Sequence, residues 1–318
     1  MPELEITTLK KLDARLPNWD LNALTERRCP FCESKGEPRY IRPDSLQIRY
    51  CKLCATFFVS PSPSEIQLND FYSNYYRDHS RYRASAREIL ENDPFSDVRI
   101  KEIASIVDLK DRHVLDVGFG LGLNIVSLKK LGAEVYGIDL DSDAINFAKK
   151  LGILNVKRCA ITELNDCTKY DLIILHDLIE HPLKPLETLK KARSLVKPNG
   201  LISIWTPNAS FALEESEPIL FRVDLEHMQY LTFRTCLYIS KILGLEIVHL
   251  ETVGFPSLKK IDKLPGRLSE RSDLRASLKR LIKSAPGFTF VNAIRKALIA
   301  PDIRRGRYHL FCIFRNMA

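Results

Sequence analysis

Three glycines in the segment HVLDVGFGLG, residues 113–122, stand where an apolar run gives way to a turn. They are Gly118, Gly120 and Gly122. Because glycine has no Cβ, a ligand can approach the backbone closely where a strand turns into a helix. Asp116 precedes the first glycine, and a second apolar run ends in Asp139, 17 residues after the last glycine. An acid at about this spacing meets the ribose hydroxyls in nucleotide-binding units, so the segment predicts a nucleoside-binding α/β site.

Two ligands fit this loop, a dinucleotide and S-adenosylmethionine. A dinucleotide fingerprint reads G-x-G-x-x-G and places the pyrophosphate on a helix N-terminus. Here the glycines alternate and Asp116 stands before them. A carboxylate at that position would repel a pyrophosphate but suits a cationic amino-acid ligand. The loop therefore favours S-adenosylmethionine, with a nicotinamide dinucleotide as the alternative.

Apolar runs bounded by turn residues predict the elements that position the loop. One buried strand ends at Leu115, and a helix is expected over residues 124–130. Further strands are expected at 133–138, 170–175, 201–205 and 308–314.

These motifs resemble the class I S-adenosylmethionine-dependent methyltransferases, and the likeness runs from about residue 95 to 255. It rests on a succession of motifs after the glycine loop. They are DLIEHP at 177–182, LVKPNG at 195–200, TPN at 206–208 and EHMQYLT at 226–232. The succession resembles the subgroup that includes ubiquinone-type O-methyltransferases and many sugar and natural-product methyltransferases. It implies an α/β fold with a Rossmann-like seven-stranded sheet whose last strand returns antiparallel beside its predecessor.

The resemblance also implies which residues hold the cofactor. Asp116, Gly118 and Gly120 would contact its methionine half, Asp139 its ribose and Leu140 its adenine. The whole predicted set is Asp116, Gly118, Phe119, Gly120, Gly122, Asp139, Leu140, Thr162 and His176. The chain departs from the family at Cys159, where relatives often have an acid that meets the adenine amino group. Backbone groups or Thr162 would replace that contact.

His181 and His227 are the candidate bases for a hydroxyl acceptor, because the ordinary histidine pKa of roughly 6.5 lies near working pH. Glu180 beside them completes the predicted catalytic set. In ubiquinone-type relatives a similar acid-x-x-acid-His group holds a divalent cation. The resemblance thus implies a Mg²⁺ site at Asp177, Glu180 and His181. The alternative is that Glu180 and His181 cap the following helix or shape the cofactor pocket.

Two C-x-x-C pairs near the N-terminus have the spacing of a four-thiolate zinc site. Their members are Cys29, Cys32, Cys51 and Cys54. Disulfides are the alternative, but the other cysteines stand mostly in apolar segments, which indicates buried thiols in a reducing compartment. A four-cysteine site has no open coordination position, so its expected role is structural. Basic and aromatic residues around it leave nucleic-acid binding as a second interpretation.

Length and composition indicate a chain of several parts. We expect an N-terminal helical lead at 1–25, a zinc ribbon at 26–60 and a linker with a tyrosine-rich helix at 61–94. The methyltransferase domain takes 95–318 and contains a basic helical insertion at 255–307. In the linker Tyr72, Tyr75 and Tyr76 either shield the site or form an interdomain packing stripe. No run reaches the ~20 apolar residues that span a bilayer, and the polar N-terminus has no signal-peptide core, so we expect a cytoplasmic protein.

The net charge of +8 is concentrated in one segment. Residues 259–307 contain fourteen Lys and Arg residues against four Asp and Glu residues. Three interpretations compete: a lid whose apolar stripe packs on the sheet domain, a peripheral contact with anionic membrane, and a nucleic-acid contact.

The predicted function is methyl transfer from S-adenosylmethionine to a small-molecule, sugar-linked or lipid-linked acceptor. O-methylation is preferred because two histidines can serve as bases, while N- and C-methylation use the same scaffold. One alternative is an RNA methyltransferase that grips its substrate with the ribbon and the basic segment. The other is a non-catalytic zinc-ribbon adaptor.

Overall fold

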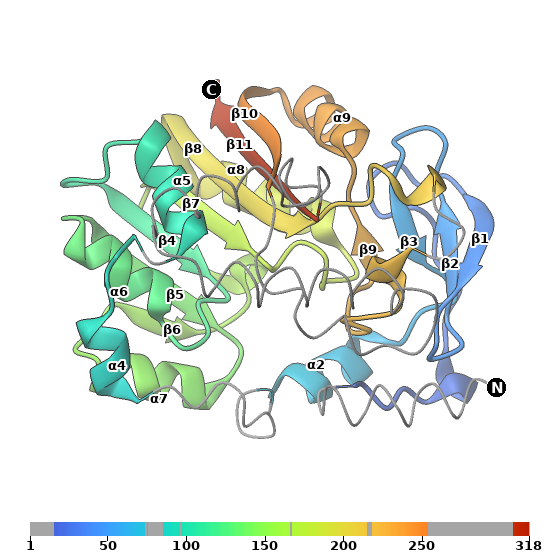
Figure 1. Ribbon diagram of the computed structural model, residues 1–318, viewed down its shortest axis with the longest axis horizontal. Helices are drawn as coiled ribbons and strands as arrows, with labels where there is room; N and C mark the ends of the chain where they lie inside the picture. Colours follow the sequence, from blue (N-terminus) through green and yellow to red (C-terminus); the bar gives the residue numbers. More distant parts are fainter. Residues whose placement is uncertain are drawn as a thin grey trace, which may run out of the picture.

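The computed structural model describes residues 16–73, 75, 85–95, 97–165, 167–214, 218–253 and 308–317. Its centre is a seven-stranded sheet with the strand order β10-β11-β8-β7-β4-β5-β6 (Figure 1). The strands are β4 (His113–Val117), β5 (Glu134–Asp139), β6 (Val156–Arg158), β7 (Tyr170–His176), β8 (Val196–Pro207), β10 (Leu245–Val253) and β11 (His309–Asn316). The helices are α2 (Glu65–Ser73), α4 (Ala86–Glu91), α5 (Val98–Ile106), α6 (Leu123–Lys130), α7 (Ser142–Lys150), α8 (Pro185–Leu195) and α9 (Phe233–Leu243).

Strand directions confirm the predicted α/β fold. The strands β6, β5, β4, β7 and β8 are mutually parallel. The last strand, β11, lies antiparallel between β8 and β10. It therefore returns beside its predecessor, as the motif succession implied.

Apolar cores cover both faces of the sheet, which is why the central strands are continuous apolar runs. On one face Leu189 of α8 and Ile239 of α9 pack with Leu115 and Ile173 of the sheet. On the other face, helices α4 to α7 pack against the strands through a core that includes Ile103. This two-sided cover leaves the carboxyl ends of the parallel strands as the place where a ligand can bind.

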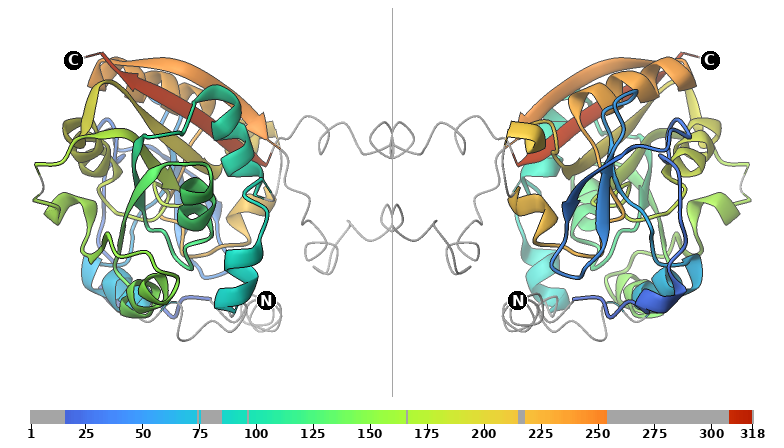
Figure 2. Two further views of the ribbon diagram at one scale, coloured as in Figure 1. Left: turned by 90° about the vertical axis from the view of Figure 1, so that its left-hand side faces the viewer. Right: turned by 90° about the vertical axis from the view of Figure 1, so that its right-hand side faces the viewer.

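A second sheet has four strands in the order β1-β2-β3-β9. Its first three are β1 (Glu37–Ile41), β2 (Gln47–Tyr50) and β3 (Phe57–Val59). We call residues 26–60, which contain these strands and the four paired cysteines, the ribbon. The fourth, β9 (Gln229–Tyr230), comes from the part of the chain expected to belong to the methyltransferase domain alone. The ribbon lies at the opposite end of the molecule from β5 and β6, and β9 pairs with its strand β3 (Figures 1 and 2). The sequence did not predict this shared sheet.

Several sequence predictions fall outside the described residues. These are the first part of the N-terminal lead at residues 1–15, Tyr76, and the basic insertion at 255–307. Among the helices that the structure does describe, none is long and apolar enough to cross a membrane.

Candidate active site

A cavity of about 1460 Å³ lies at the carboxyl ends of β4, β5, β7 and β8. Helix α2 and residues 222–227 complete its wall. Of the predicted cofactor set, it is lined by Gly118, Phe119, Gly120, Asp139, Leu140, Thr162 and His176. The predicted catalytic residues Glu180, His181 and His227 line the same cavity. The structure therefore brings the two predicted groups into one site.

The glycine loop turns from β4 into α6 with backbone conformations that side chains rarely adopt. Gly118 has φ +72° and Gly120 has φ +57°. A Cβ on Gly118 would lie 3.0 Å from the Leu178 side chain, so only glycine fits there without a shift. Gly122, the third glycine, also has a positive φ of +76°, but it is the N-cap of helix α6 and does not line the cavity. In the structure Gly122 is the residue from which α6 starts.

Asp139 at the end of β5 is held by backbone donors. Its Oδ2 accepts a hydrogen bond from Gly120 N at 2.9 Å, and its Oδ1 accepts one from Asp141 N at 2.9 Å. Burial raises the pKa of this carboxyl, and the backbone hydrogen bonds oppose that rise. Each carboxylate oxygen has a further lone pair, so Asp139 can also accept hydrogen bonds from a diol in the cavity.

Asp116 in β4 precedes the glycine loop and does not itself line the cavity. Its side chain is buried, and its Oδ2 has no hydrogen-bond partner among the described residues. Burial raises the pKa of Asp116 to about 7, although the charge of Arg99 favours the ionised form. A buried acid with an unused oxygen is unusual and marks a place where a cation would be stabilised.

Arg99 on α5 is a site residue that the sequence reading missed. It lines the cavity and pairs with Asp97 and with Asp177 after β7. Its pKa is raised by these carboxylates despite burial. The pairing also changes the predicted Mg²⁺ site, because Asp177 faces Arg99. No sequence signal distinguishes Arg99 from other basic residues on a surface helix.

Glu180, His181 and His227 form a compact cluster on two loops. One ligand-type atom from each lies within 4.8 Å of the others, and Asp177 is not in this group. His227 Nε2 lies 4.0 Å from Glu180 Oε1, and the two imidazole rings have centroids 4.8 Å apart. Glu180 is fully buried, and burial, followed by the nearby charge of Asp177, raises its pKa well above the usual range.

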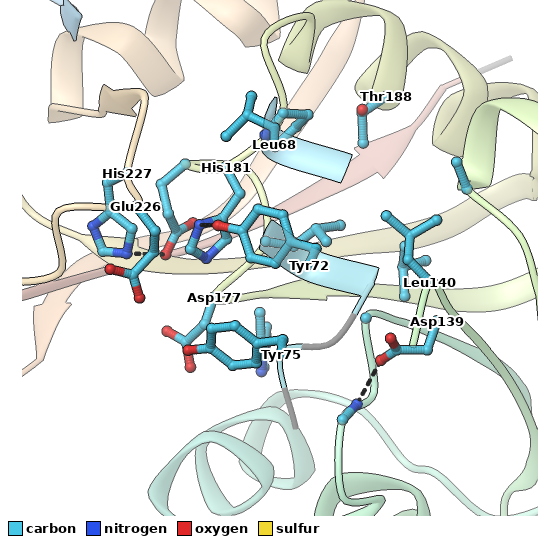
Figure 3. A pocket seen from close by; sticks show the side chains of 18 of the residues that line it. Leu68, Tyr72, Tyr75, Asp139, Leu140, Asp177, His181, Thr188, Glu226 and His227 are labelled. Atoms are coloured by element: carbon cyan, nitrogen blue, oxygen red, sulfur yellow. Dashed lines mark hydrogen bonds and ion pairs between the residues drawn. The ribbon is translucent and has the colours of Figure 1, made fainter. Parts of the chain in front are cut away.

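Tyr72 on α2 joins this cluster through a hydrogen bond of 2.6 Å between its Oη and His181 Nδ1. Figure 3 shows Tyr72 between His181 on one side and Asp139 with Leu140 on the other. Tyr75 lies close by, with its ring centroid 5.7 Å from that of Tyr72. Tyr72 therefore forms the part of the cavity wall that lies between Asp139 and the imidazole of His181.

His176 at the end of β7 is buried, although it touches the cavity. Its Nε2 lies 2.8 Å from Ser203 Oγ, and its ring packs near Trp205. Burial lowers the pKa of His176 to about 3, with the charge of Arg99 acting in the same direction. A histidine held neutral and hydrogen-bonded within the sheet shapes the cavity floor.

The four cysteines of the ribbon lie together at the other end of the molecule. Sγ–Sγ distances are 3.4 Å for Cys29 and Cys54, 3.3 Å for Cys32 and Cys51, and 3.7 Å for Cys32 and Cys54. All four are free thiols, and one sulfur from each lies within 4.8 Å of the others. These separations exceed a disulfide bond and match a set of sulfurs arranged around a single ion.

The topology and cavity define an α/β protein with a nucleoside-type site at its strand ends. Residues 78–250 match the family described as "Methyltransferase domain", which is more than half of the chain. The chain belongs to this methyltransferase family.

Curated relatives match a shorter stretch. The chain is 37% identical over 120 residues to a "Ubiquinone biosynthesis O-methyltransferase" of Coxiella burnetii, a match covering 36% of this chain and 51% of the relative. It is 32% identical over 120 residues to a protein of the same name in Colwellia psychrerythraea, covering 36% and 49%. The chain thus spans about half the length of the curated relatives it matches.

Solved structures resemble the chain more loosely. A SAM-dependent methyltransferase from Archaeoglobus fulgidus has a TM-score of 0.49 and 22% identity, covering 76% of this chain and 99% of that one. A putative sarcosine dimethylglycine methyltransferase from Galdieria sulphuraria has a TM-score of 0.43 and 18% identity, covering 68% and 83%.

Proposed function

We propose that the protein transfers a methyl group from S-adenosylmethionine to a hydroxyl of a small acceptor. The observation that carries this proposal is the single cavity shared by the glycine loop, Asp139 and the cluster of Glu180, His181 and His227. A methyl transfer needs the donor and the acceptor side by side, with a base near the acceptor oxygen.

The residues of the loop fit the cofactor. The positive φ angles of Gly118 and Gly120 keep the wall free of side chains where the methionine half would lie. The unused oxygen of Asp116 suits an ammonium group nearby, and Asp139 can accept the ribose hydroxyls. Leu140 provides an apolar contact for the base. When bound, the cofactor supplies an electrophilic methyl on a cationic sulfur.

His181 is our choice for the base. It is half-buried, whereas His227 is buried. In the tautomer that donates Nδ1–H to Tyr72 Oη, Nε2 is the basic nitrogen of His181 and would accept the proton of the acceptor hydroxyl. Once deprotonated, the acceptor oxygen would be the nucleophile for the methyl group that the bound cofactor supplies, and the neutral thioether of the cofactor would be the leaving group. His227 packs against the ring of His181, and the buried carboxyl of Glu180 lies beside both imidazoles.

The far part of the cavity suggests what the acceptor looks like. Its walls carry the polar side chains Arg222, Asp224, Glu226, Tyr308 and His309. Such walls suit a polar acceptor with several hydroxyls, so sugar-linked and lipid-linked molecules remain in the proposal beside simple phenols. Contact of residues 259–307 with an anionic membrane is a further part of the proposal and lies outside the described residues.

We also propose a structural Zn²⁺ ion at Cys29, Cys32, Cys51 and Cys54. Four sulfur donors would fill all four coordination positions of a tetrahedral zinc ion, which is the arrangement of a structural site. Its expected effect is to hold the two C-x-x-C turns together.

A divalent cation bound at the histidine cluster is the second candidate for the group that activates the acceptor hydroxyl. The donors that lie together are Glu180, His181 and His227, a mixed nitrogen and oxygen set. Such a set suits Zn²⁺, Mn²⁺ or Fe²⁺ better than Mg²⁺, which prefers oxygen ligands. A bound cation would polarise the acceptor hydroxyl in place of a free base.

The test is transfer of a tritiated methyl group from S-adenosylmethionine to a panel of catechols, sugar nucleotides and anionic lipids, with and without EDTA. We expect transfer to at least one class, and a loss of about 100-fold or more in His181→Gln, in line with the contribution of a general base. Full activity in EDTA favours the free base, and loss restored by Mn²⁺ favours the cation. Methylation of RNA alone, or no binding of the cofactor, would contradict the proposal.

A further inference from the structure

The ribbon contacts the loop of His227 through a buried arginine. Arg42, just after β1, has a side chain with no exposed surface. Its Nη1 donates to the carbonyl oxygen of His227 at 2.6 Å, and its Nη2 donates to the carbonyl oxygen of Leu225 at 2.6 Å. Asp44 accepts from Nε and Nη2, and Tyr230 Oη lies 3.3 Å from Nη1. The guanidinium has five N–H donors, and these five contacts use all of them.

The ribbon reaches the loop of Glu180 and His181 through Gln229. This side chain is fully buried on β9, where it pairs in the sheet with Phe58 of the ribbon. Its Nε2 donates to the carbonyl oxygens of Ile179 at 2.7 Å and Pro182 at 2.8 Å. Its Oε1 accepts a hydrogen bond of 3.0 Å from Arg27 Nη2, next to the first cysteine pair.

The same strand ties the two catalytic loops to each other. The amides of Met228 and Gln229 donate to the Glu180 carbonyl oxygen at 2.8 and 3.2 Å. The amide of Val59 in β3 donates to the Met228 carbonyl oxygen at 2.9 Å. The backbones of Glu180 and His227, and of Pro182 next to His181, are therefore fixed by bonds that converge on the ribbon.

We propose that the ribbon is a positioning device for the catalytic cluster, with Arg42 and Gln229 as its positioning residues. The inference rests on the proposed function for its catalytic meaning. Both side chains bond to carbonyl oxygens at or beside cluster residues, so a small shift in either moves an imidazole or the carboxylate. Displacing a reacting group by about 1 Å costs on the order of 100-fold in rate. Neither residue lines the cavity, so cofactor binding should not depend on them.

Two variants test this. Arg42→Lys keeps the positive charge beside Asp44 but has only three N–H donors on one nitrogen, which cannot replace the five contacts of the guanidinium. Gln229→Met removes the amide at similar size. Arg39→Lys is the matched control, because Arg39 is an exposed arginine on β1, the strand that ends just before Arg42. Three properties are measured on the full chain. They are the melting temperature, the affinity for S-adenosylhomocysteine by calorimetry, and the imidazole ¹H–¹⁵N signals of ¹⁵N-histidine-labelled protein.

We expect both variants to bind S-adenosylhomocysteine within about twofold of the unmodified protein. Their imidazole signals of His181 and His227 should shift while that of His113 stays in place, and Arg39→Lys should change none of them. Unmoved His181 and His227 signals in folded Arg42→Lys and Gln229→Met would overturn the inference. This readout needs neither cofactor nor acceptor, so it is distinguishable from a failure of the proposed function, which would appear as no binding by the unmodified protein.

A kinetic arm uses whichever member of the catechol, sugar-nucleotide and anionic-lipid panel gives the highest turnover. We expect Gln229→Met to lower kcat roughly 10- to 100-fold. In the double variant with His181→Ala, Gln229→Met should lower kcat little further than His181→Ala alone. A residue that acts through His181 has no further effect once that imidazole is gone. A full multiplicative loss in the double variant would show that Gln229 acts by another route and would contradict the proposal.

Discussion

Tyr72 on α2 and His181 after β7 are joined by a hydrogen bond of 2.6 Å between Tyr72 Oη and His181 Nδ1. The bond links a helix that follows the ribbon to a loop of the methyltransferase sheet. It also selects which nitrogen of His181 faces the acceptor in the proposed reaction. The consequences can be measured one residue at a time.

Tyr72→Phe should slow methyl transfer by about tenfold, because His181 loses the partner that fixes its ring orientation. The ring of Tyr72 remains, so affinity for S-adenosylhomocysteine should stay within about twofold. Steady-state kinetics and calorimetry on the same preparation separate the two effects. Equal turnover in Tyr72→Phe and the unmodified protein would remove this hydrogen bond from the mechanism.

Asp139→Ala should weaken binding of S-adenosylhomocysteine by about 1.5–3 kcal/mol through loss of charge-assisted hydrogen bonds to the ribose. Calorimetric titration measures the change. Asp143→Ala is a matched control, because it removes an exposed carboxylate from the nearby helix α7 that does not line the cavity. Unchanged affinity in Asp139→Ala would mean that this carboxylate does not hold the ribose.

Asp116→Asn should stabilise the protein at alkaline pH. The pKa of Asp116 is raised to about 7 by burial, so the folded state binds a proton that the unfolded chain releases near pH 4. The free energy of unfolding therefore falls as pH rises from about 4 to about 7, and the asparagine variant avoids this loss. The melting temperature should fall between pH 5 and pH 8 in the unmodified protein, by a few degrees more than in Asp116→Asn.

The same variant should weaken cofactor binding, because the carboxylate beside the proposed ammonium is lost. In the unmodified protein the affinity for S-adenosylhomocysteine should rise as pH passes through about 7 and Asp116 ionises. The rise should be missing in Asp116→Asn. A pH-independent affinity in both proteins would contradict this assignment.

Cys29→Ser should reduce the zinc content from about one ion per chain to near zero. Closed four-thiolate sites contribute directly to folding, so the melting temperature should fall as well. Elemental analysis and thermal unfolding measure both. Cys167→Ser serves as the control, since Cys167 is exposed and lies outside the cluster. A metal-free unmodified protein with an intact ribbon would contradict the zinc proposal.

Local patterns in the sequence predicted the features that depend on neighbouring residues. The alternation of Gly118 and Gly120 and the acid at Asp139 belong to one strand–turn–helix–strand unit, so their spacing is readable from the chain. The fold class followed from the order of these units. The paired C-x-x-C turns are local in the same sense.

Contacts between distant segments could not be read in this way. Arg42 and His227 are 185 positions apart, and nothing in the turn after β1 marks Arg42 as buried. Strand β9 has only two residues and no apolar alternation that would identify it. Arg99 on α5 and Asp177 after β7 are 78 positions apart, and their ion pair places this predicted Mg²⁺ ligand against a cation of the protein itself.

Calorimetric titration with S-adenosylhomocysteine beside NADH tests the central claim most directly. The account predicts micromolar binding of S-adenosylhomocysteine, reduced in Asp139→Ala, and no binding of NADH. Binding of NADH alone, or of neither ligand, would contradict the proposed methyltransferase function.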